Sequence, residues 1–345
     1  MKKNVLILVL FTILFNKGYG QWQWAKGRTE PYPVTGQDIC LDPSGNIYVV
    51  ASGGSAPIGW GAMTFTAKYD PLGNAKWYSC DSTMEADHRT ATAICYDGMG
   101  YIYSAGSIDP MDTLRIGTYV IPGPNYLIKY DTLGNIIWAN RTGAGHHGMK
   151  ADAAGNIYIA SDSVRKFDSN GNVLWAINVR AQSLTIDNSG NIYVLGRFNT
   201  PTIIVGSDTL TNINTTTPDF YVVRIDSNGN IIWVESAGCN ANINVGNITT
   251  DNFGNVYIVG GFYNGSVNFG TVTINSGATW EGFVAKYDSG GTVLWANGAY
   301  NNTDILGNII FDGVASLYLS GGYTGINILK MDLSGNVIGT LHMGD

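Results

Sequence analysis

The chain has 345 residues, of which 45 are Gly and 13% are charged, and acidic residues outnumber basic ones by 26 to 19. The net charge of −7 disfavours binding to nucleic acid or to anionic membranes, both of which attract basic surfaces. Few charges and many glycines are typical of turn-rich β structure.

The first twenty residues are predicted to be a signal peptide. Lys2 and Lys3 precede the apolar run VLILVLFTILF, and small residues follow at Gly18 and Gly20. The run is too short to span a bilayer comfortably, and no later segment reaches that length. Cleavage near Gly20 leaves 16 basic against 26 acidic residues, so the mature chain is expected to be secreted or at the cell surface, extracellular or periplasmic, without membrane insertion.

Two short motifs alternate along residues 21–345, which we expect to form one domain. The first, with the consensus D-x-x-G-N-I-Y, begins at Asp42, Asp97, Asp152, Asp187, Asp251 and Asp312, and its Tyr is present in every copy. The second, D-x-x-G-N-x-x-W, begins at Asp70, Asp131, Asp168, Asp226, Asp288 and Asp332, and Gly339 replaces Trp in the last copy. Asp can accept a hydrogen bond from the backbone two residues on, and Gly permits a positive φ. Each motif therefore predicts the tight turn of a β-hairpin.

Two hairpins per repeat predict a four-stranded antiparallel unit whose two apolar faces must be covered by neighbours. Six such units are expected at about 36–81, 90–142, 148–180, 183–238, 246–299 and 307–343. A β-helix needs a nearly constant coil length and Ig-like domains need about 100 residues each, whereas the steps between first-motif copies vary from 35 to 64 residues. We therefore predict an all-β, monomeric, six-bladed β-propeller.

The opening segment QWQWAKG, residues 21–27, resembles the fourth strand of a unit but has no unit of its own. We expect it to close the ring on the last blade, where Trp22 or Trp24 would take the place that Gly339 leaves empty. Burial of such an aromatic side chain contributes roughly 1.5–3 kcal/mol. The alternative is an incomplete reading frame that lacks a further blade.

Two stretches resemble known repeat families. The run GSVNFGTVTINSGATWEGFVAKYDSGGTVLWA, residues 265–296, resembles the SBBP-type β-propeller repeat of secreted bacterial proteins, and DAAGNIYIASDSVRKFDSNGN, residues 152–172, resembles an NHL-type repeat. The resemblance covers nearly all of residues 21–345 and implies a propeller fold. Such propellers have binding, structural and occasional lyase or hydrolase roles, so the resemblance does not select an activity.

Antiparallel order places all twelve Asp turns on one rim, and loops that differ between blades lie on the other, where recognition is expected. The longest links run over 107–124, 198–219 and 262–281. Candidate ligand-binding aromatic residues, suited to stacking on sugars or peptides, are Trp60, Tyr119, Tyr263, Trp280 and Tyr300. The alternative is that these side chains pack beneath the long loops.

A basic residue stands two positions before each second-motif Asp, at Lys68, Lys129, Lys166, Arg224, Lys286 and Lys330. The series is either a cationic ring for an acidic polymer or a repeated cation–π or carboxylate contact between blades, and the acidic net charge favours the contact. Calcium at the Asp turns is disfavoured, because each turn has one carboxylate where calcium needs about six to eight oxygen ligands.

Three histidines fall in links on the variable rim: His88, close to Glu85 and Asp87, and the adjacent pair His146 and His147. A His and a carboxylate brought together there would hold a metal or carry out acid–base catalysis, which makes a lyase or hydrolase the alternative function. Adjacent side chains on an extended chain point in opposite directions, which favours solvated histidines.

The four cysteines, Cys40, Cys80, Cys95 and Cys239, show no metal-binding spacing. Cys40 and Cys95 occupy equivalent repeat positions, which favours buried, unbridged thiols. Linear motifs for nucleophilic catalysis, nucleotide binding and zinc are absent from the sequence. We predict a non-catalytic binding or scaffold module without a cofactor, with a protein or a glycan as its ligand; a purely structural component is a third possibility.

Overall fold

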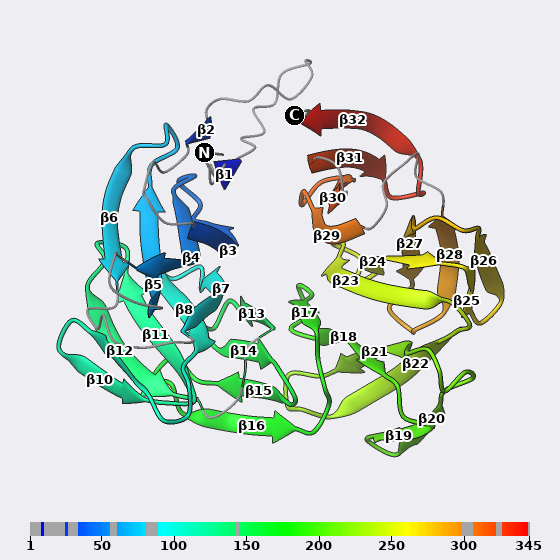
Figure 1. Cartoon of the computed structure of the whole chain (residues 1–345), viewed down its shortest axis with the longest axis horizontal. Coiled ribbons are helices and arrows are strands. Elements are labelled where there is room, and N and C mark those ends of the chain that lie inside the picture. The colour runs from blue at the N-terminus through cyan, green and yellow to red at the C-terminus, as the bar shows by residue number, and fades with distance from the viewer. Residues whose placement is uncertain are drawn as a thin grey trace. The chain divides into compact units, whose positions relative to one another are not determined.

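The computed structural model describes residues 8–9, 25–26, 34–55, 61–80, 89–142, 145, 147–298, 306–321 and 326–343. The chain forms two compact units, Met1–Ser161 with Lys166–Leu174, and Asp162–Arg165 with Trp175–Asp345. All regular secondary structure in the described ranges is β (Figure 1). The strands β1 (Leu8–Val9) and β2 (Ala25–Lys26) pair with each other, and the rest of the predicted signal peptide and closing strand lies outside the described residues.

The first unit contains antiparallel sheets in which the strands are hydrogen-bonded in chain order. The first sheet has β3 (Val34–Leu41), β4 (Ile47–Ser55), β5 (Gly61–Tyr69) and β6 (Ala75–Cys80). The second has β7 (Thr90–Tyr96), β8 (Tyr101–Ser107), β11 (Asn125–Asp131) and β12 (Ile136–Arg141). The third has β13 (Gly148–Ala151), β14 (Ile157–Ala160), β15 (Val164–Phe167) and β16 (Val173–Ile177), and the division between the units falls within it.

The second unit repeats this arrangement. The fourth sheet has β17 (Ser183–Ile186), β18 (Ile192–Phe198), β21 (Asp219–Ile225) and β22 (Ile231–Cys239). The fifth has β23 (Asn242–Thr250), β24 (Val256–Tyr263), β27 (Glu281–Tyr287) and β28 (Val293–Gly298). The sixth has β29 (Leu306–Phe311), β30 (Ser316–Gly321), β31 (Ile326–Asp332) and β32 (Val337–Met343). Four-stranded antiparallel sheets in series are typical of β-propellers.

The Asp turns have the predicted geometry, except that the Asp312 turn has Ala315 in the fourth position and its positive φ at Gly313. In the first, Asp42 Oδ1 accepts hydrogen bonds from the N–H groups of Ser44 (3.0 Å) and Asn46 (2.9 Å), and Oδ2 accepts from the Asn46 amide and the Tyr48 hydroxyl. Gly45 follows at φ 76°, a conformation that suits Gly. Second-motif turns such as that of Asp168 repeat the contacts except for the Tyr hydroxyl. The capping role is therefore confirmed.

The core lies between consecutive sheets. Ile192, Tyr193, Val194 and Leu195 on β18 are all fully buried, which explains why the second strand of a unit is apolar on both faces. One buried cluster joins the fourth and fifth sheets through side chains such as Phe220 and Phe283, and separate clusters join the first to the second, the second to the third and the fifth to the sixth. Packing between neighbouring sheets supplies the burial that one small sheet lacks.

Each of the three longest predicted links contains a two-stranded hairpin. These hairpins are β9 (Thr113–Ile116) with β10 (Tyr119–Pro122), β19 (Thr202–Val205) with β20 (Asp208–Thr211), and β25 (Gly265–Phe269) with β26 (Val272–Ser276). The third also pairs with the outer strand of the fourth sheet, through Gly238↔Asn268 and Cys239↔Val267, and extends that sheet to six strands (Figure 1).

Candidate functional site

The repeated basic residues and tryptophans connect one sheet to the next. Lys68 Nζ and Trp77 Nε1 in the first sheet both donate to the carbonyl oxygen of Thr132, in the second-motif turn of the second sheet, at 3.0 and 3.1 Å. Equivalent pairs donate to one carbonyl in two further cases, Lys129 with Trp138 to Ser169 and Arg224 with Trp233 to Ser289. We call this contact the joint.

Each basic residue of the series also lies over the first-motif Tyr of its own sheet. The cation-to-ring distances are 5.1 Å for Lys68 and Tyr48, 5.3 Å for Lys129 and Tyr103, 5.1 Å for Lys166 and Tyr158, 5.9 Å for Arg224 and Tyr193, 5.0 Å for Lys286 and Tyr257, and 5.4 Å for Lys330 and Tyr318. A repeated cation–π contact is therefore present, but it lies within each sheet, and the contact to the next sheet is instead a hydrogen bond to a backbone carbonyl.

In each four-stranded sheet, both Asp turns lie at one end, which we call the turn end, and the link between the second and third strands lies at the other, the variable end. The three extra hairpins are on variable ends. The turn end carries the repeated joints, so its Asp, basic and Trp side chains are engaged in structural contacts. Features that differ between sheets, and therefore candidate recognition sites, concentrate at the variable end.

Tyr263 and Trp280 meet at the variable end of the fifth sheet. Tyr263 is the last residue of β24 and Trp280 directly precedes β27. They therefore lie opposite each other, one position beyond the paired residues Phe262 and Glu281. Their ring centroids are 5.1 Å apart at an interplanar angle of 40°, and both side chains are half-buried. Both residues were candidates for ligand binding from the sequence, and the structure places their rings in contact.

The hairpin beside this pair is held at its base. Asn240 Oδ1 accepts hydrogen bonds from the Ser266 N–H (2.7 Å) and hydroxyl (3.0 Å), and the Asn240 N–H donates to the Ser266 carbonyl. Asn264 has a φ of 58°, the one positive value for a non-Gly residue in the described part of the chain. Asn tolerates this conformation, and its N–H donates to the Gly277 carbonyl at 2.9 Å, so hydrogen bonds hold the hairpin base on both sides.

Tyr119 is half-buried, its hydroxyl donates to the Ile137 carbonyl at 3.1 Å, and its ring packs on the cluster between the first two sheets. Its polar tip is therefore used within the second sheet. Trp60 and Tyr300 lie outside the described residues.

The histidine candidates are only partly described. His147 is exposed, and its backbone N–H donates to the Ala160 carbonyl. His88, His146, Glu85 and Asp87 lie outside the described residues. Within the described ranges, no group of three or more His, Cys, Asp or Glu side chains is placed to hold a metal ion.

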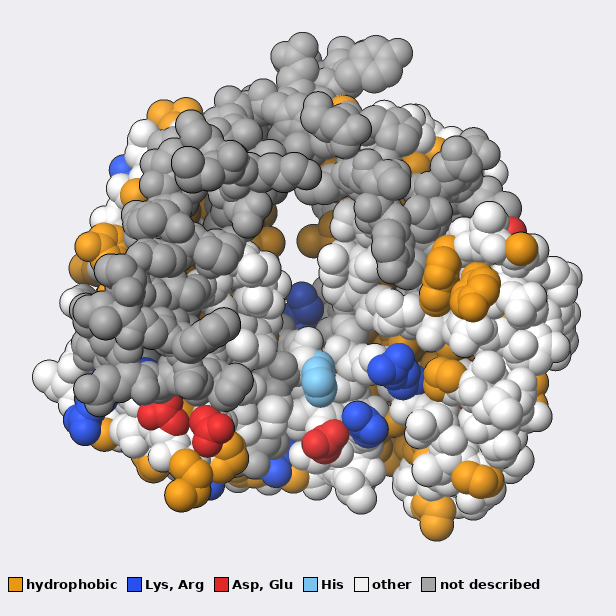
Figure 2. All heavy atoms as spheres, viewed as in Figure 1, with side chains coloured by type: hydrophobic (Ala, Val, Ile, Leu, Met, Phe, Trp, Pro, Cys, Tyr) orange, Lys and Arg blue, Asp and Glu red, His pale blue; other side chains and the backbone are white. Residues whose placement is uncertain are grey.

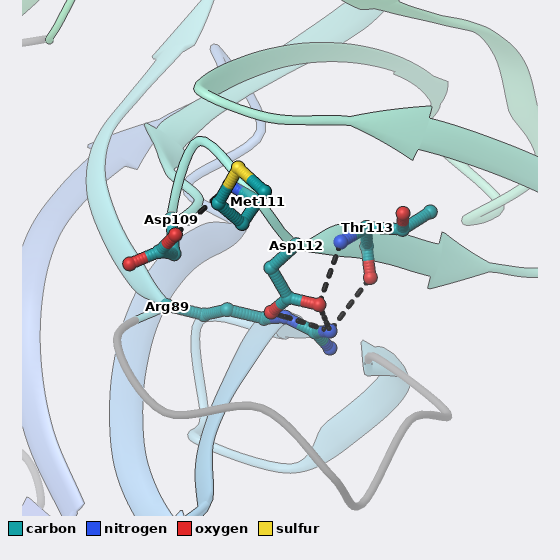
Figure 3. A network of polar contacts seen from close by, with 5 residues as sticks. All are labelled: Arg89, Asp109, Met111, Asp112 and Thr113. Atoms are coloured by element: carbon teal, nitrogen blue, oxygen red, sulfur yellow. Dashed lines mark hydrogen bonds and ion pairs between the residues drawn. The ribbon is translucent and has the colours of Figure 1, made fainter.

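A buried ion pair that the sequence did not reveal holds the β9–β10 hairpin (Figure 3). The Arg89 side chain is 1% exposed, and its guanidinium contacts both carboxylate oxygens of Asp112 at 2.9 Å and donates to the Thr113 carbonyl. Partial burial opposes ionisation of Asp112, but hydrogen bonds from Arg89 and from the Thr113 N–H hold the pKa of its carboxyl below the usual range.

Asp219 anchors the β19–β20 link in a comparable way. It is 1% exposed and accepts hydrogen bonds from the N–H groups of Cys239 (2.7 Å) and Ile213 (3.0 Å). Burial raises the pKa of its carboxyl. Each extra hairpin thus has a polar anchor of its own that the repeat does not contain.

All four cysteines are free; Cys95 and Cys239 are buried, and Cys40 and Cys80 are half-buried. Burial raises the pKa of the Cys239 thiol to about 11.

Charged side chains are sparse on the face drawn in Figure 2, where uncharged polar side chains and backbone dominate the coloured surface. In the described part of the chain, no helix has the length and apolar character needed to cross a membrane.

Comparisons with known proteins give only distant likenesses. No model of a protein family matches the chain. Over 146 residues the chain is 29% identical to an uncharacterized WD repeat-containing protein of Acanthamoeba polyphaga mimivirus; the match covers 37% of this chain and 10% of the viral protein, so the chain spans a small part of that relative.

Three solved structures are similar to the chain at low sequence identity. BamB from Moraxella catarrhalis is 13% identical, with a TM-score of 0.48 and coverage of 100% of this chain and 89% of BamB. The Pan2 WD40 domain of Neurospora crassa is 10% identical, with a TM-score of 0.48 and coverage of 82% and 85%. A protein of unknown function from Bacteroides caccae is 11% identical, with a TM-score of 0.45 and coverage of 81% and 86%. At these values the likenesses carry no functional argument.

Proposed function

We propose that the chain is a secreted β-propeller with SBBP- or NHL-like repeats that acts as a non-catalytic binding or scaffold module. Its ligand is a protein or a glycan held at the variable end. One observation carries the proposal: the basic and Trp side chains of the turn end are used in repeated joints, whereas three variable ends bear separately anchored hairpins. Rigid supports for differing loops are typical of recognition surfaces.

The experiment is a screen of the purified protein against panels of glycans and secreted proteins. Each hit is measured again with the link 262–281 shortened, and with Phe253→Ser as the control, because Phe253 is 80% exposed on a first-motif turn. Binding at the variable end predicts a loss with the shortened link and no change with Phe253→Ser. The reverse result would place the ligand on the turn end and contradict the proposal.

We also propose that the sheets are the six blades of a closed ring. Gly339 pairs with Lys330 in the same register in which Trp295 pairs with Lys286, so the sixth sheet retains the cation of the joint without its indole. An indole from Trp22 or Trp24 would complete that joint. The measurement is the unfolding temperature of Trp22→Ala and Trp24→Ala: one of them should lower it, and two neutral variants would remove the support for closure by this strand.

Among the aromatic candidates, Tyr263 and Trp280 have the clearest structural support, and Trp60, Tyr119 and Tyr300 remain proposed contacts of the same surface. The exported state is proposed from the signal-like residues 1–20, and a monomer from the repeat arrangement. N-terminal sequencing of the protein from the culture medium tests the cleavage, which is expected near Gly20.

A further inference from the structure

The Tyr263–Trp280 pair is specific to the fifth sheet. At the same register position the second sheet has Ile108 and Pro124, and the fourth has Asn199 and Pro218, beside their own hairpins. The aromatic pair is therefore no general requirement of a hairpin insertion. Packing alone gives no reason for two large aromatic residues at this position.

The polar atoms of the pair are unused. Four repeated tryptophans, at positions 77, 138, 175 and 233, donate their indole N–H to a backbone carbonyl. Across the described residues, neither the Trp280 indole N–H nor the Tyr263 hydroxyl has a hydrogen-bond partner in the protein. Two half-buried aromatic side chains thus present both ring surface and hydrogen-bonding atoms that the fold itself does not use.

Two further polar side chains adjoin the pair in sequence. Asn264 is exposed and follows Tyr263, and its side-chain amide is likewise without a partner among the described residues. Glu281 follows Trp280, and its carboxylate accepts one long hydrogen bond, from the Gly277 N–H at 3.4 Å. The indole and the phenol offer hydrogen-bonding atoms at the tilted aromatic surface, and the Asn264 amide and Glu281 carboxylate each belong to the next residue along the chain.

We propose that Tyr263, Asn264, Trp280 and Glu281 form a subsite for a neutral glycan, an inference that rests on the proposed binding function. A pyranose ring has an apolar face of C–H groups that stacks on an aromatic ring, and its hydroxyls lie at the rim, where the amide and carboxylate can bond them. The Glu281 carboxylate and the net charge of −7 disfavour uronic or sulfated polymers. The anchored hairpin base holds the rings in place before binding, which reduces the entropy lost on binding.

The test is affinity electrophoresis of the full protein in gels that contain neutral polysaccharides (glucan, mannan, galactan, xylan), with hyaluronan and heparin as anionic probes. The variants are Trp280→Ala, Trp280→Phe, Tyr263→Ala and Glu281→Gln. Tyr78→Ala is the matched control, because Tyr78 is a 77% exposed aromatic side chain on β6, away from the pair in the chain. Circular dichroism of every variant identifies any loss of fold.

We expect at least one neutral polysaccharide to retard the protein. Trp280→Ala should weaken the interaction about tenfold, the effect of losing one aromatic contact of about 1.4 kcal/mol. Trp280→Phe should retain part of the binding, Glu281→Gln should weaken it several-fold without disturbing the fold, and Tyr78→Ala should have no effect. Glu281→Gln keeps the test valid if the aromatic variants unfold.

Three outcomes overturn the subsite. Neutral glycans bound equally by the Trp280, Tyr263 and Glu281 variants would place the glycan elsewhere. Binding of anionic polymers alone would contradict the charge argument. Retardation by none of the glycans, together with a protein hit lost on shortening of the link 262–281, would reject the glycan while leaving the proposed function in place.

Discussion

The joints predict that a second-motif glycine that contacts a Trp ring, such as Gly291, is far less tolerant of Ala than a first-motif glycine such as Gly190. Gly190 and Gly291 both have positive φ, 79° and 92°. A Cβ at Gly190 would meet nothing closer than Ser227 at 3.9 Å, whereas at Gly291 it would lie 3.0 Å from the Trp233 ring. Gly190→Ala should therefore lower the free energy of unfolding by roughly 1–2 kcal/mol, the cost of placing a Cβ on a left-handed backbone. Gly291→Ala should lower the free energy of unfolding by the same amount and by about 1–3 kcal/mol more, because the new Cβ would crowd the Trp233 ring.

The assay is urea unfolding followed by circular dichroism, with midpoints compared at a common slope. The double variant Trp233→Ala with Gly291→Ala completes a thermodynamic cycle, since removal of the indole should abolish the steric part and leave only the backbone cost. Equal losses for Gly190→Ala and Gly291→Ala, within about 0.5 kcal/mol, or additivity in the cycle, would refute the view that the Trp ring and the turn glycine form the contact between the sheets.

Three further predictions concern the anchors and the titratable groups. Hydrogen bonds from the Asn172 side chain and from backbone N–H groups lower the pKa of Asp168. The contribution of Asp168 to stability is therefore complete above its unfolded pKa near 3.9 and is lost as pH falls through its folded pKa. The unfolding temperature should decrease below about pH 4, and it should decrease less steeply for Asp168→Asn. Cys95 and Cys239 are buried and should react with a thiol reagent at pH 8 only after unfolding, whereas rapid labelling of the native protein would contradict their burial. Arg89→Met leaves the Asp112 carboxylate without its guanidinium and should destabilise by about 3–5 kcal/mol, with faster amide exchange first in β9–β10; uniform exchange would contradict the anchor.

The turns and sheets were predictable because their causes are local. Asp42 and Gly45 lie three residues apart, and both the hydrogen bonds and the positive φ of their turn follow from that short segment. The cation–π contact of Lys68 with Tyr48 was also predictable in kind, since a repeated pair at fixed spacing must meet repeatedly. Four-stranded antiparallel sheets followed from hairpins in series.

The anchors and the aromatic pair depend on contacts across links of unequal length. Arg89 and Asp112 are 23 residues apart, and Asn240 and Ser266 are 26 apart, with no repeat to align them. Tyr263 and Trp280 were named as separate candidates, but their contact required the register of β24 on β27. The pairing of β25 with the preceding sheet had no sequence signal, because neither partner belongs to the repeated motif.

That pairing gives the β25–β26 hairpin two roles. Its bonds through Gly238 and Cys239 cover part of the exposed edge of β22, which would otherwise be open to pairing with other chains. The same bonds fix the hairpin whose base lies beside Tyr263 and Trp280. The β19–β20 hairpin forms a separate two-stranded sheet and covers no outer strand by ladder pairing. The same residues therefore protect a strand edge and hold the loop that bears Tyr263 and Trp280, which supports the proposal that ligand binds at this variable end.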